Sequence, residues 1–212
     1  MSALAKAVSL TRHILLALGM ATTFGVSSLS AATVSYSTTL PEVAFANPTA
    51  NSTIGSTAVL DQNVFGSVTN QRRSPWDAEN STLDYTVPTA FYSAIRSDEK
   101  SVQASAVYNF NSVMGALSLV WGSPGAKNQL EFLLDGSSQL TLSGAAPQSA
   151  TGRLSVLLSV TDIQFNQLVF SADHRAFEYA NLSVVPVPLP AGLPLLGAGL
   201  LALGLLRRCR RA

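Results

Sequence analysis

The stretch Gln129-Leu130-Glu131-Phe132-Leu133-Leu134-Asp135-Gly136 decides the fold class of this chain. Its residues Leu130, Phe132 and Leu134 fall on one face of an extended backbone, because successive side chains of a strand point to opposite sides. The polar residues between them fall on the other face. The closing Asp-Gly pair favours a tight turn. The pattern predicts a half-buried strand that ends in a turn.

Similar short runs recur along the chain between clusters of Gly, Pro, Asn, Asp and Ser, whereas capped stretches of helical period are scarce. The clearest predicted strands are 33–38, 91–96, 101–110, 116–121, 129–134, 139–142, 154–160, 167–170 and 176–184. The less patterned region 41–80 offers one or two more, such as 57–60 and 64–68. We therefore expect an all-β fold, a single jelly-roll-like β-sandwich over residues 33–185.

The C-terminal region, residues 186–212, has three parts in a fixed order. They are a proline motif (Val187, Pro188, Leu189, Pro190, Ala191), an apolar run over 192–206 and a basic end (Arg207, Arg208, Arg210, Arg211). Residues 189–206 carry no charge, and a helix of that length would span roughly 27 Å, enough to enter a bilayer. We expect a transmembrane helix at 192–206, with the arginines keeping the C-terminus in the cytoplasm.

The prolines before this run stiffen the chain. Pro186, Pro188 and Pro190 each fix φ near −65° and push the preceding residue into extended geometry. The segment is predicted to form a stiff, extended stalk. On physical grounds alone it fits a linker before a permanent anchor as well as it fits a segment presented to a processing enzyme.

The N-terminal region predicts export. Lys6, Arg12 and His13 precede an apolar stretch over 14–26 and then small residues. This is the pattern of a secretory signal peptide, here residues 1–32. The first-choice cleavage site follows Ala32, and the second choice follows Ala31. The expected partners are thus the Sec translocon and signal peptidase.

The order of motif, apolar run and arginines resembles the PEP-CTERM class of bacterial sorting signals, in its VPLPA-CTERM variety. The resemblance implies that an exosortase, an integral-membrane cysteine transpeptidase, recognises the tail. It also implies that the tail is removed, and that the protein passes from a transient stay in the inner membrane to the cell envelope, surface or extracellular matrix.

Three strings before the tail resemble a group of exosortase-dependent surface proteins: Leu119-Val120-Trp121-Gly122-Ser123-Pro124, Asn128-Gln129-Leu130-Glu131-Phe132 and Phe177-Glu178-Tyr179-Ala180-Asn181. Two aspartates usual in that group are replaced here by Gly125 and Ala180. If those aspartates share a cation site, the resemblance implies that this chain has lost it. The group brings no enzymatic activity with it.

Charge is unevenly distributed. Two of the 13 Lys and Arg lie in the signal region and four in the tail, whereas all 12 Asp and Glu lie between, so residues 33–186 carry a formal charge of −5. No basic surface for nucleic acid is expected. The sole cysteine, Cys209, lies outside this region, so the exported domain has no disulfide.

Motifs for catalysis are missing from the sequence. His174 is the one histidine of the mature region and reads as an exposed turn residue, and no nucleophile elbow, phosphate loop or dinucleotide fingerprint occurs. We expect neither an enzyme nor a cofactor. Asp77, Glu79 and Asp84 are the weak candidates for a Ca²⁺ site, although a solvated loop explains them better in the absence of an Asp-x-Asp-x-Asp-Gly loop.

Most aromatic side chains are expected in the core. Trp76 is the best candidate for an exposed ring that contacts a sugar, because it falls in a predicted loop. The leading expectation is an exported surface protein with a structural or adhesive role in envelope polysaccharide. The rivals are a carbohydrate-binding module on a permanent single-span anchor and, last, a secreted hydrolase.

Overall fold

The computed structural model describes residues 31–41, 44–76, 91–100, 102–151, 155–173, 176–188 and Ala198. Several predictions concern residues outside this set: the signal peptide up to residue 30, the acidic group Asp77, Glu79 and Asp84, His174, and the tail from Leu189 onwards apart from Ala198. Among the described residues, no helix is long and apolar enough to cross a membrane.

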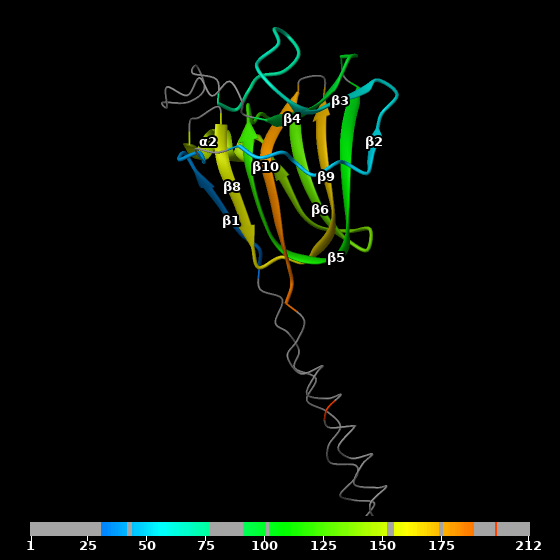
Figure 1. Ribbon diagram of the computed structural model, residues 1–212, viewed down its shortest axis with the longest axis vertical. Coiled ribbons are helices and arrows are strands. Elements are labelled where there is room, and N and C mark those ends of the chain that lie inside the picture. The colour runs from blue at the N-terminus through cyan, green and yellow to red at the C-terminus, as the bar shows by residue number, and fades with distance from the viewer. Residues whose placement is uncertain are drawn as a thin grey trace, which may run out of the picture. The chain divides into compact units, whose positions relative to one another are not determined.

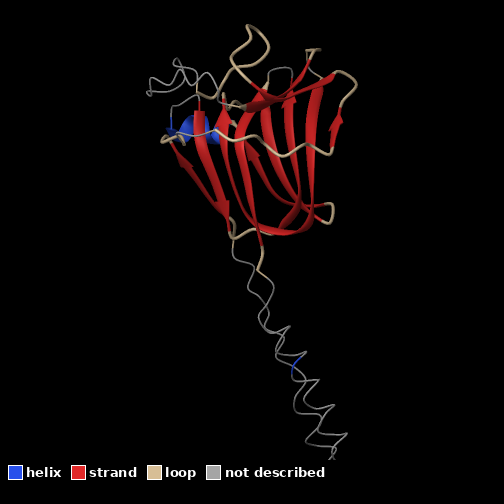
Figure 2. Cartoon of the chain, in the orientation of Figure 1, coloured by secondary structure: helices blue, strands red, loops and turns tan. Residues whose placement is uncertain are grey.

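Strands joined in one antiparallel sheet make up most of the domain, as predicted for the fold class (Figure 2). They are β1 (Thr33–Ser37), β2 (Ser52–Ile54), β3 (Ala58–Val64), β4 (Tyr92–Ser97), β5 (Gln103–Gly122), β6 (Asn128–Leu134), β7 (Ser137–Ser143), β8 (Ser155–Thr161), β9 (Phe165–Asp173) and β10 (Phe177–Pro186). A short helix, α2 (Ala145–Thr151), lies next to β1. The turn between β6 and β7 has positive φ at Asp135 and Gly136, which fits the tight turn that the sequence predicts there.

The long strand β5 organises the sheet (Figure 1). Its first part, around Ala106, pairs with β2 and β9, and β9 continues through β6 to β7. Its last part, around Leu119, pairs with β10 and β8, which continue to β4 and β3 and to β1. The pairing of β5 with β9 shifts register between Asn109 and Met114. One strand therefore belongs to two differently paired parts of the sheet.

Aromatic rings from both parts of the sheet pack against one another in the core. Phe170 of β9 stacks on Tyr179 of β10 at 4.3 Å between ring centroids and meets Phe177 edge-on at 5.3 Å. Strand β5 separates β9 from β10 in the sheet order, so these contacts do not come from hydrogen-bonded neighbours. Trp121 stacks on Phe177 at 4.6 Å, and both are fully buried. These rings belong to the larger of the two apolar clusters in the described part of the chain, and their burial stabilises the domain.

A second, smaller cluster covers the other face of the β4–β10–β5 region. It consists of Leu40, Trp76, Tyr92, Ala94, Val120, Ala176 and Ala180. The expectation of an exposed Trp76 is wrong: the side chain is 2% exposed, and its Nε1 donates a hydrogen bond to the carbonyl oxygen of Pro41. The ring is buried because it packs in one cluster with Leu40 and Ala44 on this face of the sheet, so it can offer no stacking surface to a sugar.

Three further details differ from the predicted elements. The predicted strands 101–110 and 116–121 fall largely within the single strand β5, which begins at Gln103 and continues through Gly115 instead of turning there. Residues 64–68 mostly leave the strand pattern after β3, where Val68 only bridges Arg72. Strand β2 and helix α2 lack a clear apolar pattern, so periodicity gave no sign of them.

Candidate functional site

The three sequence strings at residues 119–124, 128–132 and 177–181 meet at one end of the sheet. Gly122 of the first string lies opposite Glu178 of the third in the β5–β10 pairing. Asn128, from the second string, donates from Nδ2 to the carbonyl oxygens of Ser123 (3.4 Å) and Ala176 (3.3 Å). The three strings therefore form one structural unit, although they are far apart in the chain.

The connection from β5 to β6 is held tightly at this end. Asn128 is 3% exposed, its backbone N–H donates to the carbonyl of Gly125, and its own carbonyl accepts from Gly144. A Cβ on Gly144 would lie 2.5 Å from the Gly125 carbonyl oxygen, so only glycine permits this approach. Ser123 has a φ of 46° and begins the turn. The backbone carbonyls and amides of residues 123–128 are thus fixed in position.

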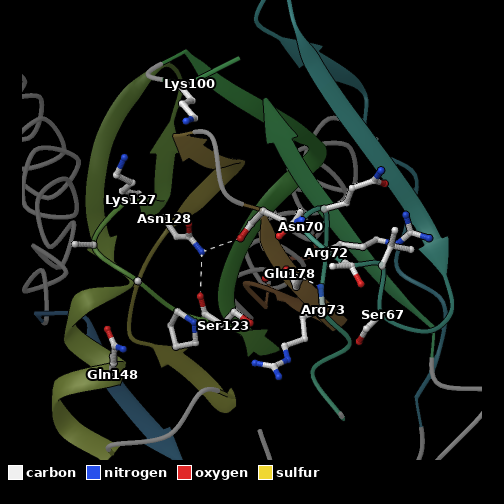
Figure 3. A pocket seen from close by; sticks show the side chains of 17 residues that line it. Ser67, Asn70, Arg72, Arg73, Lys100, Ser123, Lys127, Asn128, Gln148 and Glu178 are labelled. Atoms are coloured by element: carbon white, nitrogen blue, oxygen red, sulfur yellow. Dashed lines mark hydrogen bonds between the residues drawn. The ribbon is translucent and has the colours of Figure 1, made fainter. Parts of the chain in front are cut away.

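An open depression of about 1350 Å³ lies over this end (Figure 3). It is lined by residues 67–73, Lys100, residues 123–128, Gln148, Ala176 and Glu178. In Figure 3, Glu178 lies between the side that carries Arg72 and Arg73 and the side that carries Asn128 and Lys127. Four separate segments of the chain contribute to it besides β10.

The loop that forms one wall, residues 66–73, is anchored by side chains of the sheet. The Tyr92 hydroxyl donates to the carbonyl of Gly66 at 2.6 Å, and burial raises the pKa of Tyr92 to about 12, so the hydroxyl keeps its proton. Arg72 pairs with Asp61 through Nη1 at 2.9 Å. The backbone N–H of Arg73 donates to Oε1 of Glu178 at 2.9 Å. These contacts hold the loop against β3, β4 and β10.

The lining is rich in cations. Arg72, Arg73, Lys100 and Lys127 all border the depression, and Glu178 is the one carboxyl among its described lining residues. Asp61 forms an ion pair with Arg72, and Oδ2 of Asp173 lies 3.5 Å from Nζ of Lys127. Lys100 and Lys127 are exposed. The depression presents positive charge on a domain that is negative as a whole.

Glu178 is the unusual residue of the site. It is 4% exposed, and within the described part of the chain its Oε2 is buried without a hydrogen-bond partner. Burial raises the pKa of Glu178 to about 8, against the opposing effect of hydrogen bonds from the backbone. The carboxyl is therefore mostly protonated at pH 7 and can donate through its O–H. A lone carboxyl does not make the two-carboxylate pair that glycoside hydrolysis requires.

The residues singled out from the sequence fall in different places. Trp76 is buried beside the depression and does not line it. Ala32 directly precedes β1. Among the described residues, no three His, Cys, Asp or Glu side chains are grouped to hold a metal ion. Gly125 lines the depression, whereas Ala180 is fully buried in the cluster under Trp76, so the two positions that lack aspartate have different surroundings.

Glu178, Arg72 and Arg73 were not identified as site residues from the sequence. Strand alternation puts Glu178 on the face opposite Phe177 and Tyr179, which suggests solvent exposure. The face is instead covered, because Pro75 packs where a Cβ of Gly122 would lie. The available signal was a glutamate between two aromatic residues, Phe177 and Tyr179, in a predicted strand.

At the other end of β10 the predicted proline motif begins as soon as the strand stops. Val187 is half-buried, and its N–H donates to the carbonyl of Val113 at 2.9 Å. Pro188 is exposed.

Searches against protein-family models, curated proteins and solved structures find no match to this chain.

Proposed function

We propose that this chain is an exported bacterial surface or matrix protein whose tail is sorted and processed by an exosortase. The Sec pathway exports it, and signal peptidase cuts after Ala32. The apolar segment 192–206 and the arginines that follow hold it in the inner membrane, while the motif Val187–Ala191 is presented for cleavage. The exported domain then has a structural or adhesive role in envelope polysaccharide.

The observation that carries this proposal is the order of the C-terminal parts. A proline motif, an uncharged run and four arginines follow one another without interruption. The end of β10 adds support: the last strand stops at Pro186, Val187 is still bound to β5, and Pro188 is exposed. An enzyme at the membrane surface would meet an extended motif directly beside the folded domain.

The finer architecture belongs to the proposal as well. We infer that the two parts of the sheet that share β5 form a β-sandwich of the jelly-roll kind. Supporting this are the ring contacts between β9 and β10, two strands that are not hydrogen-bonded to each other. A sandwich with loops gathered at its ends suits a binding module, since its ends can vary while its core is kept.

Replacement of both Pro188 and Pro190 with alanine tests the sorting proposal. The double variant should still be exported, but should collect in the inner membrane, because the extended motif is lost. Cell fractionation with an antibody against the domain measures this. The matched control is Pro186→Ala, which lies just before the motif and should leave sorting unchanged. Normal release of the double variant would rule out a role for the motif.

The second candidate is a carbohydrate-binding module on a permanent single-span anchor. The cation-lined depression favours a binding role whether the tail is removed or retained. The two candidates differ in the C-terminus of the mature protein. Retention of Arg210 in protein from the cell surface would favour the permanent anchor.

A further inference from the structure

The cations of the exported region are concentrated at one place. Of its seven Lys and Arg, four (Arg72, Arg73, Lys100 and Lys127) line the depression. Of its 12 Asp and Glu, only Glu178 is found among the described lining residues. Residues 33–186 carry a formal charge of −5, so a randomly chosen patch of the surface would be expected to hold more carboxylates than cations. The arrangement points to a negatively charged ligand.

A second, independent feature also points to a ligand. Glu178 is more than nine-tenths buried in the depression, yet its Oε2 has no partner within the described part of the chain. A buried polar atom without a partner costs free energy of about 1–3 kcal/mol, so such atoms are rare in folded proteins. A ligand group at this atom would satisfy it.

The uncharged lining residues indicate what kind of anion fits. Amide and hydroxyl groups are contributed by Ser67, Thr69, Asn70, Gln71, Ser123, Asn128 and Gln148. Such groups match a ligand that carries many hydroxyls. None of the described lining residues is aromatic. Among these residues, nucleic-acid bases find no ring on which to stack, and neutral sugars find no aromatic platform.

We propose that this depression binds a segment of an acidic polysaccharide, in which Lys100 and Lys127 meet the acidic groups and Glu178 hydrogen-bonds a ligand oxygen. This deepens the adhesive role proposed above and rests on it for placing the domain outside the cell. The acidic groups are carboxylates or sulfates, which share the chemistry that cations recognise. Lys100 and Lys127 are the contact residues because both are exposed at the rim.

The protonation of Glu178 fits this ligand. A neutral carboxyl can donate its O–H to an anionic or hydroxyl oxygen, whereas an ionised one would repel the ligand. Arg72 and Arg73 flank it, with Arg72 held by Asp61 and the Arg73 N–H bound to Oε1. Glu178→Gln keeps a donor and an acceptor at the same place, so it should preserve binding, whereas Glu178→Ala should weaken it.

Binding is measured by titration calorimetry on the full-length chain in detergent, at low ionic strength. The probes are an oligogalacturonate, a sulfated dextran oligosaccharide, an unmodified dextran oligosaccharide of equal length and a single-stranded oligonucleotide. Binding of the first or the second, and not of the unmodified dextran, is expected, and the pair tells carboxylate from sulfate. Equal binding of the unmodified dextran, or tighter binding of the oligonucleotide, would overturn the proposal.

The variant that tests the site is Lys100→Gln combined with Lys127→Gln, which should weaken binding by about tenfold. The matched control is Ser137→Glu combined with Gln139→Glu, two exposed positions of β7 in the hairpin turn region. It changes the net charge by the same amount but leaves the lining intact, so its affinity should stay within about twofold. Equal losses in the two variants would show that only net charge matters and would refute the site.

These measurements are independent of tail processing. The alanine replacements at Pro188 and Pro190 should not alter the affinity for the acidic probe, and the lysine variant should still be sorted. Failure to bind either acidic probe overturns the depression as a polysaccharide site while leaving the sorting proposal untouched. Circular dichroism of each variant confirms that a lost affinity does not come from unfolding.

Discussion

The two ends of β10 differ in their burial and in the residues that surround them. At Phe177 and Glu178 the strand is buried on both faces and borders a polar, cationic depression. At Val185 and Pro186 it is exposed, and it leads into the proline motif. Ten residues of strand separate the ends by about 30 Å. Under the two proposals, one end of β10 contacts the ligand and the other end leads into the processed tail.

The largest difference between the ends should be in stability. Phe177→Ala removes a fully buried ring that stacks on Trp121 and contacts Phe170, and should lower the free energy of unfolding by about 3–5 kcal/mol. Val185→Ala on the same strand should change it by less than about 0.5 kcal/mol, because that side chain is 56% exposed. Urea unfolding followed by tryptophan fluorescence compares them, since both tryptophans are buried in the domain. Similar losses would contradict the comparison.

The buried carboxyl at the depression should give the domain a characteristic pH dependence. The folded state holds the Glu178 proton up to about pH 8, whereas the unfolded chain releases it near pH 4.5. Between these values the folded state binds more protons, so stability falls as pH rises, by about 1.4 kcal/mol per pH unit. Glu178→Gln should remove this part of the slope in unfolding measured at pH 5 to 8. An unchanged slope would show that Glu178 is ionised in the folded protein.

The turn that forms the depression should tolerate less change than a comparable polar pair elsewhere. Asn128→Ala removes a buried hydrogen bond to the Ala176 carbonyl and a partly buried one to the Ser123 carbonyl, and should cost about 1–3 kcal/mol. Asn166→Ala removes the exposed bonds to Asp135 and should cost well under 1 kcal/mol. Thermal unfolding of the two variants gives the comparison. A larger loss at Asn166 would mean that the turn is held mainly by other contacts.

The smallest effect is expected at the tail end. A Cβ on Gly115 would lie 3.1 Å from Cγ2 of Val187, so Gly115→Ala should loosen Val187 and lower stability by less than about 1 kcal/mol. The same change should speed proteolysis just after β10. Gly125→Ala is the control, because nothing lies within 4 Å of its Cβ position. Equal proteolysis of the two variants would show that Val187 is not held by its contact with β5.

The sequence predicted the parts of this domain in which side-chain alternation dominates. Strands such as 129–134 and 176–184 were recognised because their apolar residues repeat every second position. The continuation of β5 through Gly115 was not, since glycine signals a turn unless a distant segment such as Val187 packs against it. Burial of Trp76 was missed for a similar reason, because the loop that buries it packs on residues far away in the chain.

The candidate site was less predictable than the fold. Its strings were noticed through resemblance, but their meeting point depends on the pairing of β5 with β10 and on the turn at Asn128. The raised pKa of Glu178 results from a covered sheet face, which alternation cannot reveal. The concentration of cations likewise appears only when loops from β3, β4 and β5 are brought together.

The most direct test of tail removal is to identify the C-terminal residue of the mature protein taken from the surface of native cells. Peptide mass spectrometry should find a C-terminus within Val187–Ala191 and no peptide from 192–212. Protein that still ends in Arg210, Arg211 and Ala212 would contradict the account and leave a domain on a permanent anchor.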